Sequence, residues 1–173
     1  MSESSSVIML SGPVGAGKTT VARELLRLLT APVSYIEGDT FWPFIADAGG
    51  RSRRENFPLI MRSMTAAAIP FARSGFVVLL DFSIPPEFLP TARKILKEVP
   101  LDYVVLRPSL AVCKSRAADR KEGVIAEYGP YRSFYELFDA APRFTIEDDE
   151  ADAAAVALRI RDGLPVERFR VRS

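Results

Sequence analysis

Histidine is absent from the 173-residue chain, and cysteine occurs once, as Cys113. Without histidine the chain cannot build a histidine-based catalytic triad or the usual histidine-containing zinc sites. A single cysteine excludes an internal disulfide. Cys113 lies among small and apolar residues of a helical pattern, so we expect it to be a buried packing residue and not a nucleophile. General base chemistry must therefore come from carboxylates.

Long hydrophobic segments and a strong net charge are also missing. No apolar run approaches the about 20 residues that span a bilayer, and residues 1–6 have neither the basic nor the apolar part of a signal peptide. The net charge of +1 provides no field that would attract nucleic acid or an anionic membrane surface. We therefore expect a cytoplasmic protein with neither a membrane nor nucleic acid as a partner; the sequence specifies no oligomeric state.

Apolar strand-like runs alternate with helical patterns, which predicts an α/β fold with a parallel sheet covered by helices on both faces. We expect residues 1–173 to form one domain. Pro70 is expected to kink or split the helix that contains it. The predicted strands are 7–10, 33–36, 76–81, 101–106 and a weaker one around 143–146; the predicted helices are 20–29, 55–73, 87–98, 110–121 and 151–162.

The segment between the first strand and the first helix fits the phosphate-binding P-loop template Gly-x-x-x-x-Gly-Lys-[Ser/Thr] at every fixed position. Glycines allow the loop to wrap a polyphosphate with its N–H groups, and the helix that follows adds the positive end of its dipole. Lys18 is placed to follow the transferred phosphoryl group, and the Thr19 hydroxyl to ligate Mg²⁺. The residues predicted to bind the nucleotide are Gly12, Pro13, Val14, Gly15, Ala16, Gly17, Lys18, Thr19 and Thr20.

Two carboxylates, Asp39 and Asp81, follow predicted strands, where open parallel sheets bind their ligands. Transfer of a phosphoryl group to a hydroxyl needs a carboxylate beside the acceptor, and Asp39 is our first choice for it. An N-cap for a helix beginning near Phe41 is the alternative interpretation of Asp39. Asp81 could hold Mg²⁺ or contact the acceptor, or it could simply form a turn.

Two arginines, Arg116 and Arg120, lie four residues apart in a helical pattern just before an irregular segment. That segment, residues 122–133, is predicted to be a lid that brings the guanidinium groups over the phosphates. A solvated helix face is the competing interpretation of both arginines. Arg132 is a weaker candidate within the lid.

An aromatic cluster at 41–44 follows Asp39, and three arginines lie in the Gly-rich segment after it. Trp42 is a candidate for stacking on the acceptor, although packing in the core explains an aromatic residue equally well. Arg54, with Arg51 and Arg53, could hold an anionic group of the acceptor; a solvated run of charges is the alternative.

These motifs resemble those of the P-loop small-molecule kinases, a group that includes gluconate kinase, shikimate kinase, chloramphenicol phosphotransferase and the zeta toxins. The likeness rests on the loop at 12–19, on Asp39 and Asp81, and on the pair Arg116 and Arg120. It implies a P-loop NTPase fold of three layers, α/β/α, with a five-stranded parallel sheet in the order 2-3-1-4-5 and a small lid. It further implies ATP with Mg²⁺ as phosphoryl donor and a hydroxyl of a small molecule as acceptor.

The chain also departs from individual members of that group. Kinases similar to adenylate kinase carry Asp-Gly-[Phe/Tyr]-Pro-Arg after the third strand, whereas this chain has Asp81-Phe82-Ser83-Ile84 there. Nucleotide acceptors are therefore less expected. Gly38-Asp39 looks more like gluconate kinase than like the paired aspartates of shikimate kinase, but the absence of histidine makes gluconate itself doubtful as the acceptor.

The sequence thus predicts an ATP-dependent phosphotransferase in which Lys18 and the loop hold the phosphates, Thr19 holds Mg²⁺ and Asp39 activates the acceptor. A nucleotide-dependent switch that phosphorylates no metabolite is the alternative from another class. A polynucleotide 5′-hydroxyl kinase is a third hypothesis, and the nearly neutral charge disfavours it.

Overall fold

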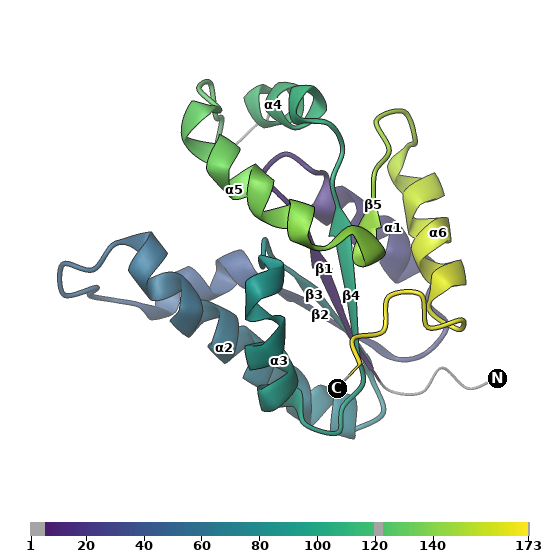
Figure 1. Cartoon of the computed structure of the whole chain (residues 1–173). Coiled ribbons are helices and arrows are strands. Elements are labelled where there is room, and N and C mark those ends of the chain that lie inside the picture. The colour runs from purple at the N-terminus through teal and green to yellow at the C-terminus, as the bar shows by residue number, and fades with distance from the viewer. Residues whose placement is uncertain (1–5, 120–122, 173) are drawn as a thin grey trace.

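The computed structural model describes residues 6–119 and 123–172, and its centre is a five-stranded parallel sheet in the order β2-β3-β1-β4-β5 (Figure 1). Every neighbouring pair of strands is parallel. The predicted architecture and strand order are therefore confirmed. The strands are β1 (Val7–Ser11), β2 (Val33–Glu37), β3 (Val77–Asp81), β4 (Leu101–Leu106) and β5 (Thr145–Ile146).

The three central strands are buried along their whole length because helices cover both faces of the sheet. In β1, Ile8 and Leu10 point into one apolar cluster, whereas Val7 and Met9 point into the other. Helices α1 (Lys18–Leu28) and α6 (Ala153–Gly163) supply the first cluster, and α2 (Arg53–Arg73) and α3 (Leu89–Leu96) supply the second. Because successive residues of a strand point to opposite faces, and both faces are covered, consecutive residues of these strands are mostly apolar.

Helix α2 runs without a break through Pro70, so the expected split of this helix is wrong. Pro70 cannot donate to the carbonyl of Ala66, but both residues lie on the solvent-exposed side of the helix, where water can replace the lost bond. The helix begins at Arg53, two residues before the predicted start, because Ser52 and Glu55 form a reciprocal capping box.

Short helical segments connect the remaining elements. Helix α4 (Leu110–Ala118) ends before residues 120–122, so the predicted end of this helix at Lys121 lies outside the described residues. The other segments are η1 (Gly38–Phe44), η2 (Pro86–Phe88), η3 (Gly129–Tyr131), α5 (Arg132–Glu136), η4 (Leu137–Ala140) and η5 (Pro142–Phe144).

The end of the chain returns to the sheet beside β4 (Figure 1). The amide of Tyr103 donates to the carbonyl of Phe169, and the amide of Val171 donates to the carbonyl of Leu101. Phe169 is fully buried. Residues 168–172, in which arginine alternates with apolar residues, thus form one antiparallel bridge with β4.

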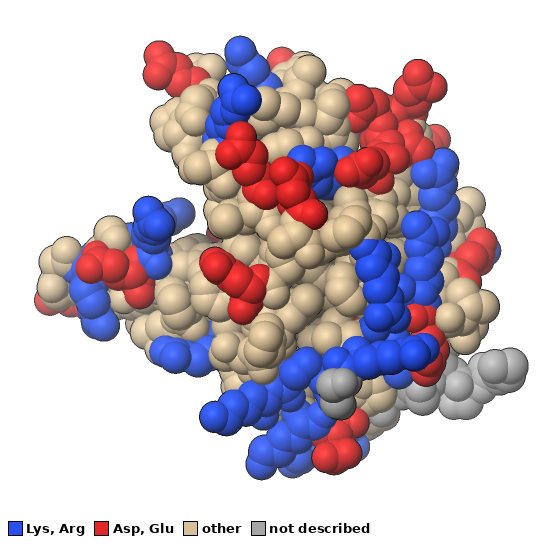
Figure 2. Space-filling model, in the orientation of Figure 1, with Lys and Arg blue, Asp and Glu red and all other residues tan. Residues whose placement is uncertain are grey.

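The positive side chains are unevenly distributed over the face that Figure 2 shows. Lys and Arg form a band over its lower part, around the end of the chain, whereas the carboxyl ends of the strands point the other way. The described exposed basic residues at that end include Lys94 and Lys97 near α3, and Arg168 and Arg172 in the tail. Among the described residues, no helix is long and apolar enough to cross a membrane.

Candidate functional site

The loop between β1 and α1 owes its shape to glycine. Gly12, Gly15 and Gly17 have φ values of 138°, 82° and 89°, a region that side chains rarely adopt. A Cβ at Gly12 would lie 2.1 Å from the carbonyl oxygen of Leu106, and one at Gly15 would lie 2.1 Å from that of Cys113. The loop is therefore pressed against the end of β4 and against α4, and only glycine fits at these two points.

Helix α1 starts from this loop without a side-chain cap. Gly17 occupies the N-cap position, and no side chain accepts a hydrogen bond there. The amides of the first turn therefore remain directed toward the loop, as an anion-binding helix terminus requires. The Lys18 ammonium donates to the carbonyls of Gly12 and Pro13, at 3.2 and 3.0 Å. These contacts place the predicted phosphate-binding cation inside the curve of the loop.

The Thr19 hydroxyl and the Asp81 carboxylate meet at the end of the two central strands. Thr19 Oγ1 donates to Asp81 Oδ2 at 2.8 Å. The carboxylate is buried, with 3% of the residue exposed, and the register of β3 places Asp81 beside Leu10 of β1. The sequence predicted both residues as metal-binding candidates, and the fold brings them together.

A third side chain, Tyr35 of β2, reaches the same carboxylate. Its hydroxyl donates to Asp81 Oδ2 at 3.0 Å. Burial raises the pKa of Tyr35, and the neighbouring negative charge of Asp81 raises this pKa further, so the phenol remains a neutral donor. The sequence analysis did not single out Tyr35.

The oxygen ligands of this site fit Mg²⁺ better than a metal held entirely by protein. Mg²⁺ in nucleotide sites takes one or two protein oxygens and completes its octahedron with phosphates and water. Thr19 and Asp81 supply that number. Among the described residues there is no group of three or more Asp, Glu, Cys or His that could hold a metal alone. Any cation here would therefore depend on a bound phosphate.

Two further carboxylates lie at the end of β2. Glu37 pairs in register with Asp81, and burial, followed by the charges of Asp81 and Asp39, raises the pKa of Glu37. Asp39 is exposed and lies inside η1, whose N-cap position is occupied by Glu37, so Asp39 is not the N-cap of this helix. The sequence analysis overlooked Glu37, although the spacing of Tyr35 and Glu37 on one face of a strand could have indicated it.

Aromatic rings line the surface next to these carboxylates. The ring centroids of Trp42 and Phe82 are 6.4 Å apart, and Phe82 stacks on Phe57 with 5.2 Å between their centroids. Gly38 permits this arrangement, because a Cβ at this position would lie 2.3 Å from the Phe82 ring. Trp42 is therefore partly engaged in core packing.

The arginines of the adjoining segment differ in position. Arg53 places its guanidinium carbon 5.0 Å from the centroid of the Trp42 ring, a cation–π contact. Arg54, which the sequence selected as a substrate ligand, is the next residue of α2 and is exposed. The structure thus brings one arginine of this run directly onto the predicted stacking residue.

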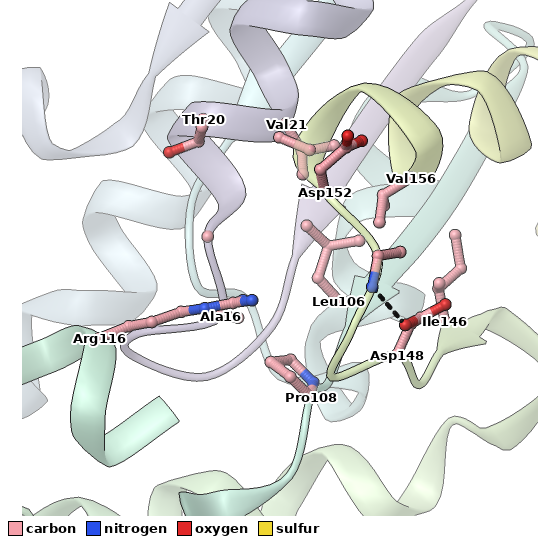
Figure 3. A pocket seen from close by; sticks show the side chains of 13 residues that line it. Ala16, Thr20, Val21, Leu106, Pro108, Arg116, Ile146, Asp148, Asp152 and Val156 are labelled. Atoms are coloured by element: carbon pink, nitrogen blue, oxygen red, sulfur yellow. Dashed lines mark hydrogen bonds between the residues drawn. The ribbon is translucent and has the colours of Figure 1, made fainter. Parts of the chain in front are cut away.

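A cavity of about 240 Å³ lies between the loop and the start of α6, on the side of the loop away from Asp81 and Glu37 (Figure 3). Figure 3 shows Arg116 extending from α4 toward the loop at Ala16. An ideal Cβ on Gly17 would lie 3.5 Å from a terminal guanidinium nitrogen of Arg116. The lining is Ala16, Gly17, Thr20, Val21, Leu106, Pro108, Arg116, Ile146, Asp148, Ala151, Asp152, Ala153 and Val156. The cavity therefore combines apolar walls with one arginine beside the phosphate-binding loop.

The turn before α6 closes one side of this cavity and is held by Asp148. Its Oδ1 accepts hydrogen bonds from the amides of Glu150 and Ala151, the second of which is drawn in Figure 3. These bonds, with the Arg159 side chain, lower the pKa of Asp148. Asp152 then caps α6 by accepting from the amide of Ala155.

Of the predicted lid, residues 122–133, the described part 123–133 is attached to the loop through Tyr128. The Tyr128 hydroxyl donates to the carbonyl of Val14 at 2.7 Å. The Tyr128 ring is buried in the apolar cluster to which α1 and α6 contribute. The sequence analysis missed this contact, since it joins residues 114 positions apart. Arg132 pairs with Glu136 at 3.2 Å. Arg120 and Glu122 lie outside the described residues.

Comparison with known proteins yields one family and several relatives. A family model described as "AAA domain" matches residues 7–127. A cytidylate kinase of Pyrobaculum arsenaticum is 35% identical over an alignment of 79 residues, and the match covers 42% of this chain and 42% of that protein. The match thus spans less than half the length of that relative.

Two solved structures superpose on nearly the whole chain. APS kinase of Mycobacterium tuberculosis, in complex with AMPPNP and APS, has a TM-score of 0.71 at 21% identity and covers 92% of this chain and 97% of its own. The tunicamycin resistance protein of Deinococcus radiodurans has a TM-score of 0.72 at 18% identity and covers 98% and 99%. At these identities the superpositions show a common fold.

Proposed function

The chain belongs to the family described as AAA domain, with a P-loop kinase fold, and on that premise we propose that it transfers the γ-phosphoryl group of ATP to a small-molecule hydroxyl. The observation that supports this most strongly is the contact of Thr19 with Asp81 at the start of α1. This pair, beside a glycine loop that contains Lys18, is the arrangement that P-loop phosphotransferases require.

In this proposal the loop amides and Lys18 bind the β- and γ-phosphates of ATP. Thr19 and Asp81 hold Mg²⁺, which when bound neutralises charge on the phosphate oxygens. The cavity between the loop and α6 takes the base and ribose, because it is the space with apolar walls next to the phosphate-binding loop. Arg116 extends over the loop from α4 and stabilises negative charge that spreads during transfer.

Asp39 orients the acceptor hydroxyl and accepts its proton. It lies two residues after Glu37, which pairs in register with Asp81, so the acceptor side of the site adjoins the metal side. The aromatic surface of Trp42 supports the rest of the acceptor, and Arg54 with Arg53 binds any anionic group on it. The segment at 122–133 acts as the lid of a single domain that comprises residues 1–173, and we place this domain in the cytoplasm.

The carboxylates favour a hydroxyl acceptor over a phosphate. Glu37, Asp39 and Asp81 lie close enough for the charges of Asp39 and Asp81 to raise the pKa of Glu37. An acceptor phosphate beside them would meet like charge, whereas a hydroxyl can donate to them. The partial match to a cytidylate kinase nevertheless makes nucleoside monophosphates the necessary comparison in any screen of acceptors.

The test is a screen for acceptor-dependent ADP release from ATP and Mg²⁺, with sugars, nucleosides, antibiotics, nucleoside monophosphates and RNA 5′ ends as acceptors. We expect turnover with a hydroxyl compound and not with a phosphate as the acceptor group. Lys18→Ala should abolish turnover and weaken ATP binding, whereas Asp39→Asn should abolish turnover and leave ATP binding intact. Asp47→Asn is the matched control, because Asp47 accepts a local bond from the amide of Gly49 and has no role in the proposed site.

Three outcomes would overturn parts of the proposal. Slow hydrolysis that no acceptor accelerates would support a nucleotide-dependent switch instead. Turnover on RNA 5′ ends alone would support a polynucleotide kinase, although the basic band lies at the end of the molecule opposite to the carboxyl ends of the strands (Figures 1 and 2). Full turnover by Asp39→Asn would remove Asp39 from the mechanism.

A further inference from the structure

Tyr35 and Thr19 donate to the same oxygen of one buried carboxylate. The two distances to Asp81 Oδ2 are 3.0 and 2.8 Å. Two donors on one oxygen fix the rotation of the carboxylate group, and neither of these donors bonds to the second oxygen, Oδ1. A carboxylate that is held in this way presents its second oxygen in one direction.

The geometry of the sheet explains why a tyrosine can make this contact. Tyr35 of β2 lies opposite Leu79 of β3, which is two residues before Asp81. Residues two apart on a strand share a face and are separated by about 6.6 Å along it. A serine or threonine at position 35 could not span that rise, whereas a phenol can. Tyr35 therefore reaches diagonally from the edge strand β2 to Asp81 at the end of the neighbouring strand β3.

A phenol also suits the electrostatics of the site. An arginine or lysine in its place would form an ion pair and neutralise the carboxylate, which would weaken its attraction for a cation. Tyr35 remains a neutral donor, so it can hold the carboxylate without cancelling its charge. Because Tyr35 contacts neither ATP nor an acceptor in the proposed arrangement, its role is to act through Asp81.

We propose that Tyr35 is a positioning residue that orients the Asp81 carboxylate for the Mg²⁺ that accompanies the nucleotide. This inference rests on the proposed function, since it assigns Asp81 to the metal and not to the acceptor. Outer partners that orient a ligand are typically worth about 10- to 100-fold in metal affinity. The hydroxyl of Tyr35 is thus expected to affect the magnesium dependence of nucleotide binding and little else.

The experiment measures the affinity of the full chain for AMPPNP by calorimetry, once with saturating Mg²⁺ and once with EDTA. The ratio of the two affinities reports the contribution of the metal. We expect Tyr35→Phe to lower this ratio about 10-fold and to leave the affinity in EDTA unchanged. Unchanged affinity in EDTA also shows that the variant is folded and that its loop is intact.

The matched control is Tyr103→Phe, which removes another buried phenol hydroxyl, one that donates to the carbonyl of Ile84 on the opposite face of the sheet. It should leave the ratio unchanged. A second test places Tyr35→Phe in an Asp81→Asn background, where it should change the ratio by less than about twofold, because residues that act as a unit are not additive.

Several results would overturn the inference while the proposed function stands: a wild-type ratio in Tyr35→Phe, an equal fall in Tyr103→Phe, or full additivity with Asp81→Asn. If the wild-type chain binds no AMPPNP with or without Mg²⁺, the proposed function fails and the role of Tyr35 fails with it. The EDTA measurement on the wild type therefore separates the two failures.

Discussion

Glycine is required in the phosphate-binding loop for conformation and, at two positions, for space as well. Gly15 has a φ of 82°, and its missing Cβ is what allows the carbonyl of Cys113 to approach. Gly75, in the turn after α2, has a φ of 88° but has no atom within 4 Å of an ideal Cβ. The two glycines share a backbone conformation and differ in the space around them.

Substitution of Gly15 and of Gly75 allows the cost of the strained backbone conformation and the cost of the clash to be measured separately. Gly75→Ala should lower the free energy of unfolding by about 1 kcal/mol, since it adds only left-handed strain. Gly15→Ala should lower it by about 2 to 4 kcal/mol, because a clash in packed surroundings is added to the same strain. Urea unfolding of both variants checks the difference. Equal losses would show that the loop is not pressed against α4.

Residues whose roles are local could be predicted from the sequence, and residues whose roles depend on register could not. Lys18 and Thr19 follow from the loop motif, and Asp81 from its place after an apolar run. Tyr35 and Tyr128 act through hydrogen bonds to residues 46 and 114 positions away. Nothing in their immediate sequence marks those contacts, which exist only once the strands and the lid segment are in place.

At the scale of elements, the tail is fastened to β4 by a buried ion pair. Arg170 donates to both carboxylate oxygens of Asp102, at 3.0 and 3.2 Å, and the Asp102 side chain is 1% exposed. Burial raises the pKa of Asp102 in spite of these bonds. A raised folded pKa means that the contribution of Asp102 to stability is fully present below its ordinary pKa and declines as the pH rises through the folded value.

Removal of the arginine should therefore destabilise the protein in a pH-dependent manner. Arg170→Ala leaves a buried carboxylate without its cation, which should cost about 3 kcal/mol near neutral pH. Burial then acts unopposed and raises the pKa of Asp102 further, so the loss should shrink as the pH falls and the carboxyl becomes neutral. Urea unfolding at neutral and at acidic pH measures this change.

Arg172→Ala serves as the control, because Arg172 is 72% exposed and lies 3.9 Å from Glu167. It should cost almost nothing at either pH. If Arg170→Ala lost more stability at acidic than at neutral pH, the assignment of the effect to a charged Asp102 would be wrong.

Most elements could be predicted because long apolar runs and helical periodicity dominate them. The strand at 101–106 has the predicted bounds. Helix α2 differs from the prediction because Pro70 lies on its exposed face, a fact that depends on packing. Strand β5 is only two residues long, because pairing with β4 at Val105 and Leu106 defines it, and its own sequence carries little signal.

At the scale of the whole molecule, strand order explains the position of the site. β1 lies between β3 and β4, so the loop after β1 meets Asp81 on one side and the end of β4 on the other. Ligands of open parallel sheets bind at such carboxyl ends. The order itself could be predicted only through resemblance to a family, whereas the alternation of strands and helices followed from the residues.

The acceptor side could be predicted least, for a physical reason. Its surface combines Trp42, Phe82 and Phe57, from three separate segments that meet at the Phe82 ring, for which Gly38 leaves room. Pocket shape of this kind depends on several distant segments at once, so no short motif encodes it.

The central claim is that the loop at 12–19 and Lys18 bind the phosphates of a nucleoside triphosphate with Mg²⁺. Calorimetry with ATP and Mg²⁺ tests it most directly, on the wild type, on Lys18→Ala and on Lys94→Ala, an exposed lysine in α3, as control. We predict one binding site per chain that requires Mg²⁺ for full affinity, is lost in Lys18→Ala and is unchanged in Lys94→Ala. Absence of binding to the folded wild type, or undiminished binding by Lys18→Ala, would contradict the account.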